Sequence, residues 1–117
     1  KNENYRSGWL GDWLYNKIMP RSDGSVFKIP SPKHLHASKE GLDGREELHR
    51  FLQQCDALDD ILRHVSTKDL QRIRIPFNFS KFIKLRLGDM LRYLVAHNER
   101  HLLQAHRVMK QVPAEAV

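Results

Sequence analysis

One stretch of sequence decides the fold of this chain: residues 87–112, LGDMLRYLVAHNERHLLQAHRVMKQV. Its apolar residues recur at steps of three and four, the period of a helix with one face on a core. That stripe consists of Leu87, Met90, Leu91, Leu94, Val95, Asn98, Leu102, Ala105, Val108, Met109 and Val112. We predict a long helix here, with Asp89 in its first turn, where the helix dipole favours a negative charge.

Two histidines, His97 and His101, stand four positions apart in this helix. At that spacing their directions differ by only about 40°, so both imidazoles can reach one point such as a metal ion. His101 falls inside the apolar stripe, His97 and Gln104 fall on its edge, and Arg100 falls on the wetter flank. His106 points to the other side. We therefore take His97 and His101 as candidate metal ligands.

A structural interpretation of the same pair stays open, because a histidine at the border of a core is often simply hydrogen-bonded there. Asn98 follows His97, so the H-E-x-x-H pattern of zinc proteases is absent. The sequence assigns no catalytic residue.

Residues 3–19 form a second predicted helix. Gly8 and Gly11 weaken it, each by up to about 1 kcal/mol relative to Ala, and small residues can also mark a close approach to another helix. Its apolar face consists of Tyr5, Trp9, Leu10, Trp13, Leu14 and Ile18. The two tryptophans either line a pocket or fill the core.

A long connection rich in Pro, Gly and Ser follows, over residues 20–41, and we expect His34 and His36 in it to be solvated. Asp43 and Glu46 then have the spacing of a capping pair for a helix that ends near Val65. Its apolar residues form a narrow seam, on which we expect Cys55 to be a small buried side chain. The seam consists of Leu48, Phe51, Leu52, Cys55, Leu58, Leu62 and Val65.

The net charge of +6 lies entirely in the second half of the chain, where residues 66–117 hold ten Lys and Arg against four Asp and Glu. Basic and aromatic residues alternate there, as they do in some nucleic-acid sites. The set consists of Arg72, Arg74, Phe77, Phe79, Lys81, Phe82, Lys84 and Arg86. Ile73, Ile75, Phe77 and Phe79 occupy alternate positions, as in an extended segment with one face on a core. We therefore favour a solvated basic edge over a nucleic-acid site. We expect Pro76 to end the extended segment.

The length of 117 residues predicts one domain over residues 1–117. No apolar run is long enough to cross a bilayer, and a single cysteine cannot form an internal disulfide. We expect a cytoplasmic protein with no membrane partner.

The runs LGDMLR at residues 87–92 and AHNERHLLQA at residues 96–105 resemble the final helix of the DinB-like superfamily. That superfamily includes predicted metal-dependent hydrolases and bacillithiol or mycothiol S-transferases. The tryptophan-rich first helix, the loop with Phe27, Lys28 and Pro30, the seam helix and the extended segment occur in the family's order, so the resemblance covers nearly the whole chain. The pattern H-x-x-R-H-x-x-Q, from His97 to Gln104, is the most specific part of it.

The resemblance implies an all-α fold, a four-helix bundle with a long crossover, often dimeric, that holds nickel or zinc on three histidines. Two of these correspond to His97 and His101. The third normally lies on the second bundle helix, which corresponds here to residues 3–19 and contains no histidine. We expect the domain to be incomplete at its amino end, with the missing ligand and the first bundle helix supplied upstream of Lys1 or by a partner subunit.

Two functions follow as expectations. The first is a divalent-metal-dependent S-transferase or hydrolase that acts on a small molecule, with Arg100 or Gln104 orienting ligands or binding an anionic substrate. The second is a non-catalytic bundle that serves dimerisation or partner binding, with structural histidines. A homodimer is the expected assembly, and nucleic-acid binding is disfavoured.

Overall fold

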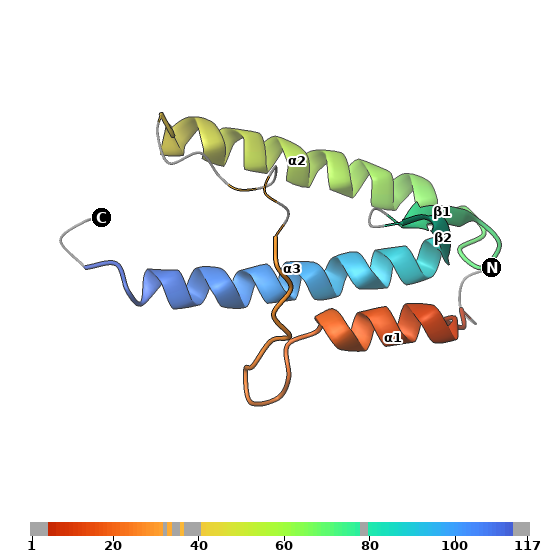
Figure 1. Ribbon diagram of the computed structural model, residues 1–117. Coiled ribbons are helices and arrows are strands. Elements are labelled where there is room, and N and C mark those ends of the chain that lie inside the picture. Colours follow the sequence, from red (N-terminus) through yellow and green to blue (C-terminus); the bar gives the residue numbers. More distant parts are fainter. Residues whose placement is uncertain (1–4, 32, 34–35, 37–40, 78–79, 114–117) are drawn as a thin grey trace. The chain divides into compact units, whose positions relative to one another are not determined.

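The computed structural model describes residues 5–31, 33, 36, 41–77 and 80–113 (Figure 1). Three helices and two strands follow one another: α1 (Trp9–Ile18), α2 (Gly44–Val65), β1 (Arg74–Phe77), β2 (Ser80–Arg86) and α3 (Leu87–Met109). The chain is mostly helical, as predicted. A small antiparallel sheet is an addition that we did not predict, and the described residues contain no fourth helix.

The chain is divided into two compact units. One includes Ile29–Lys68 and therefore α2. The other includes Glu3–Lys28 and Asp69–Val117, with α1, both strands and α3. Within the described residues, no helix combines the length and the apolar content needed to span a bilayer.

Helix α2 has the predicted bounds. The side chain of Asp43 accepts hydrogen bonds from the backbone N–H groups of Arg45 and Glu46, which have no partner inside the helix. Arg50 pairs with Glu46 one turn later. The predicted burial of its seam is wrong for this chain: no residue of α2 is buried, and Cys55 is exposed. The physical reason is that α2 is the only α-helix or strand among the described residues of its unit, so no second described helix or strand of that unit covers the seam.

Helix α1 and helix α3 run in the same direction, side by side (Figure 1). The predicted start of α1 at residue 3 is wrong, since the helix begins at Trp9, and Tyr5 lies before it rather than on its face. Both tryptophans are exposed instead of filling the core, Trp9 at 82% and Trp13 at 53%. Helix α3 begins at Leu87, as predicted, and ends at Met109.

The strands pair as an antiparallel hairpin in which Ile75 lies opposite Leu85. Pro76 does not end the extended segment, because β1 continues to Phe77. The register shifts between Pro76 and Phe77, as expected where a proline removes a ladder donor. Phe79 lies outside the described residues.

The core of this unit is small. Its buried apolar side chains are Ile18, Phe77, Leu85, Leu87 and Ala96. The buried face of α3 is therefore centred on Ala96 rather than on the predicted Val95, which is 59% exposed. Near the carboxyl end, Leu102, Val108 and Met109 are exposed as well. The predicted stripe is covered over the first half of α3 only.

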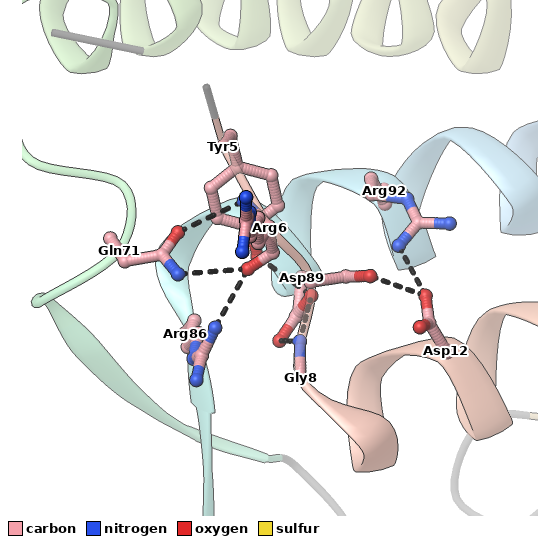
Figure 2. A network of polar contacts seen from close by, with 9 residues as sticks. Tyr5, Arg6, Gly8, Asp12, Gln71, Arg86, Asp89 and Arg92 are labelled. Carbon is pink, nitrogen blue, oxygen red and sulfur yellow. Dashed lines mark hydrogen bonds and ion pairs between the residues drawn. The ribbon is translucent and has the colours of Figure 1, made fainter. Parts of the chain in front are cut away.

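Asp89 joins the beginnings of α1 and α3 (Figure 2). It is only 2% exposed, and its carboxylate accepts hydrogen bonds from the Tyr5 hydroxyl at 2.6 Å and from the Gly8 backbone N–H at 3.1 Å. Gly8 is the N-cap of α1, so Asp89 places a negative charge at the positive ends of two helices.

Glycine is required where α1 passes over this carboxylate. A Cβ on Gly11 would overlap Asp89, at 2.5 Å from both carboxylate oxygens. A Cβ on Gly88 would likewise overlap the Tyr5 ring. The close approach suggested by the small residues of α1 is therefore confirmed.

The network continues on both sides of Asp89 (Figure 2). Arg92 of α3 pairs with Asp12 of α1 at 2.7 Å. On the other side, Arg86 and the side chain of Gln71 both donate to the backbone carbonyl of Arg6. These contacts hold α1 and the residues before it against the start of α3. They therefore fix the orientation of α3, the helix that carries the histidines, relative to α1.

The Tyr5 hydroxyl makes stability depend on alkaline pH. Burial, followed by the hydrogen bond to Asp89 and its negative charge, raises the pKa of the Tyr5 phenol well above its usual range. A raised folded-state pKa contributes stability below the unfolded pKa of about 10, and this contribution is lost as pH rises toward the folded value. We expect Tyr5→Phe to cost about 1–2 kcal/mol at neutral pH.

Urea unfolding of both proteins between about pH 8 and pH 11 checks this prediction. The stability of the parent protein should fall faster than that of Tyr5→Phe, so that the two curves converge at high pH. Parallel curves over the whole range would contradict the role assigned to Tyr5. Tyr93 adds a dependence of stability on pH that is the same in both proteins, because burial raises the pKa of Tyr93 as well.

Candidate metal centre

The rings of His97 and His101 lie together on α3. Their Nε2 atoms are 2.8 Å apart, and the ring centroids are 4.4 Å apart. Helical spacing of four residues produces this approach, as the sequence predicted. Their burial differs from the prediction, however: His101 is exposed, whereas His97 is partly buried, because the covered face of α3 is centred on its neighbour Ala96.

Aromatic rings cover one side of His97. The Tyr93 ring, one turn earlier on α3, stacks on His97 at a centroid distance of 6.0 Å. Phe77 of β1 packs edge-on against Tyr93 at 5.2 Å. Burial lowers the pKa of His97, and the positive charges of His101 and Arg100 lower it further. A lower pKa favours the neutral form of His97, which is the form that ligates metals.

Gln104 orients the second ring. Its Oε1 lies 3.2 Å from Nδ1 of His101. Because an amide oxygen only accepts, Nδ1 of His101 carries the proton, and Nε2 of a neutral His101 is then a free lone pair directed at His97. Nδ1 of His97 is buried and has no hydrogen-bond partner among the described residues.

The distance between the two Nε2 atoms can be compared with the distance between two histidine nitrogens bound to one metal ion. Two imidazole nitrogens on a tetrahedral zinc ion, each at about 2.0–2.1 Å, are about 3.3 Å apart. The observed 2.8 Å is shorter, so the rings would separate by about half an ångström to hold an ion between them, a change within reach of two side-chain torsions. The donor types and their convergence fit two positions of such a site.

Among the described residues, a third ligand is not found near the pair. Within the part of the chain that the structure describes, no group of three His, Cys, Asp or Glu side chains is placed to hold a metal ion. His36 is exposed, with a ring nitrogen 3.1 Å from the carbonyl of Ser31. His34 lies outside the described residues.

A small cavity of about 160 Å³ lies beside Gln104. Val26, Arg100, Gln104 and Arg107 line it. Arg100 donates a hydrogen bond to the carbonyl of Phe27, and Arg107 donates one to the carbonyl of Gly24. Two guanidinium groups, with no acidic residue among the described lining residues, make this cavity suitable for an anion.

Sequence reasoning missed three residues of this region: Tyr93, Val26 and Arg107. Tyr93 precedes His97 by four positions and shares its helix face, and Arg107 follows Arg100 by seven positions and shares the face of Arg100, so both could have been found by spacing. Val26 lies on a loop, and no pattern in the sequence indicates where that loop packs.

Comparison with protein families supports the resemblance noted in the sequence. The family model described as DinB superfamily matches residues 6–105, which include both histidines and Gln104 and extend across both units. Comparisons with curated proteins and with solved structures return no match. Since the matched region covers most of the chain, this protein belongs to the DinB superfamily.

Proposed function

We propose that this chain binds a divalent metal ion, nickel or zinc, through Nε2 of His97 and Nε2 of His101. The observation that carries the proposal is the 2.8 Å approach of these two atoms, with His101 oriented by Gln104. A third donor comes from outside the described residues, either from the same chain or from a second copy in a homodimer. When bound, such an ion lowers the pKa of a coordinated water or thiol.

We propose further that the protein acts as a transferase or hydrolase on a small anionic molecule in the cytoplasm. The cavity lined by Arg100, Gln104 and Arg107 supports this substrate class, because Gln104 also contacts His101 and two positive charges line the cavity. Arg100 and Arg107 would bind the anionic group. Gln104 would keep the His101 ring in position.

A second candidate function is a non-catalytic bundle with structural histidines, and one observation favours it. A separation of 2.8 Å is that of a hydrogen bond, so His97 can donate its Nε2–H to Nε2 of His101 without any ion. In that arrangement only an acceptor lone pair, on Nδ1 of His97, lacks a partner among the described residues. The pair would then stabilise α3 and contribute nothing to metal uptake.

Calorimetric titration with Ni²⁺ and Zn²⁺ distinguishes the two functions. We expect the double variant His97→Ala/His101→Ala to bind each ion at least about tenfold more weakly than the parent protein. His106→Ala is the matched control, since it removes an exposed imidazole from the same helix and should leave the affinity unchanged. Equal affinity in the parent and the double variant, with lower stability in the variant, would support the structural function instead.

A further inference from the structure

A second and larger cavity lies at the carboxyl end of α1, and the histidine pair does not line it. Its volume is about 390 Å³, within the range of small-molecule sites. The lining residues are Trp13, Asn16, Lys17, Met19, Arg21 and Phe27. They come from the last turns of α1 and from the segment that follows it.

Two aromatic rings form walls of this cavity and are open to solvent. Trp13 is 53% exposed and Phe27 is 43% exposed. The Nζ of Lys17 lies 4.8 Å from the centroid of the Trp13 ring and 4.5 Å from that of Phe27. Because one ammonium group reaches both rings, the two rings and the charge lie within the span of a single small ligand.

The charge of the cavity is positive. Lys17 and Arg21 line it, and none of the acidic side chains that the structure describes does. Asp23 partly balances Arg21, whose charge contributes to lowering the pKa of the Asp23 carboxyl, after the hydrogen bonds from Ser25. Lys17 forms no ion pair with any carboxylate of the described residues. Its ammonium group is therefore available to an anionic ligand.

The loop wall is held in place before any ligand binds. Arg21 and Ser25 are joined by a backbone hydrogen bond across a turn in which Gly24 has a φ of 76°, a conformation that favours glycine. Arg100 and Arg107 of α3 donate to the carbonyls of Phe27 and Gly24. A wall fixed in this way reduces the entropy lost on binding.

We propose that this cavity is a binding site for a small aromatic carboxylate. The ring of the ligand would lie against Trp13 and Phe27, and its carboxylate would pair with Lys17, with Arg21 as the second cation. Apolar walls with a few convergent polar groups are typical of such sites. The proposal does not depend on metal binding at His97 and His101.

A titration with 2-naphthoate in the presence of EDTA tests this proposal. It is followed through the indole N–H signals of the two tryptophans in nitrogen-15 NMR spectra. Trp9→Phe assigns the signals, and Trp9, which is 82% exposed and does not line the cavity, is an internal reference. We expect 2-naphthoate to shift the Trp13 signal saturably, with a Kd below about 1 mM. Lys17→Met keeps the aliphatic length without the charge and should bind at least about tenfold more weakly. Lys110→Met is the matched control, because Lys110 is exposed and lies beyond the end of α3.

Two further ligands separate the contributions of ring and charge. Neither 2-naphthalenemethanol, which lacks the charge, nor acetate, which lacks the ring, should saturate the Trp13 signal in the same range. Equal binding of the neutral alcohol, or equal affinity of Lys17→Met and the parent protein, would overturn the proposal. Loss of the Trp13 shift in His97→Ala/His101→Ala would also overturn it, since the anion would then belong to the histidine pair.

Discussion

Asp89→Ala is expected to lower the free energy of unfolding by about 3–5 kcal/mol, a large part of the stability of a typical domain. The carboxylate is 2% exposed and accepts from Tyr5 and Gly8. Its removal leaves a partly buried hydroxyl and a partly buried backbone N–H without their acceptor, each at a cost of about 1–3 kcal/mol. It also removes a negative charge from the beginnings of α1 and α3.

Urea unfolding followed by circular dichroism measures this effect, and Asp89→Asn is the graded control. The amide keeps one acceptor oxygen but loses the charge, so its cost should lie between those of the parent protein and Asp89→Ala. A double-mutant cycle isolates the contact with Tyr5: Tyr5→Phe should cost clearly less in the Asp89→Ala background than in the parent. Additive losses would show that the two side chains contribute independently and would contradict the network.

Gly11→Ala is the second large effect, with an expected loss of about 2–3 kcal/mol. On an open helix the same substitution stabilises by about 1 kcal/mol, since Ala is the better helix former. Here the new methyl group would overlap the Asp89 carboxylate, at 2.5 Å from both of its oxygens. Asp89 cannot move away without breaking its bonds to Tyr5 and Gly8, so the steric cost exceeds the gain in propensity.

Gly44→Ala is the matched control for this prediction. Gly44 is the first residue of α2, and a Cβ there would meet no atom within 4 Å. We expect it to be neutral or to stabilise by up to about 1 kcal/mol. If Gly11→Ala raised the thermal midpoint as Gly44→Ala does, the close packing of α1 against Asp89 would be disproved.

Periodicity alone was enough to place α3 and α2. Helix α3 has an apolar repeat of more than five turns and α2 has a similar seam, and these repeats placed both helices. Asp43 also set the start of α2, whereas α3 has no side-chain cap. The hairpin was only half predicted. The alternation of Ile73, Ile75 and Phe77 predicted an extended segment, but the pairing of two extended segments is a non-local event that no single segment specifies.

Local spacing also decided the candidate metal centre. Four residues separate His97 from His101, and three more lead to Gln104, so the helix itself brings these side chains together. The sequence alone therefore determined the identity and the mutual approach of the candidate ligands. It also carried the pattern by which the chain was identified as similar to the DinB superfamily, to which the family match assigns it.

Tertiary structure alone decided which faces are covered. Asp89 was expected only to suit the dipole of its own helix, yet it binds the start of α1, because two elements distant in sequence meet there. Cys55 was expected to be buried and is exposed, and both tryptophans are exposed rather than packed in a core, with Trp13 lining a cavity. A helical repeat specifies which residues share a face, whereas burial depends on what packs against that face, and this is set by contacts between segments that no local pattern encodes.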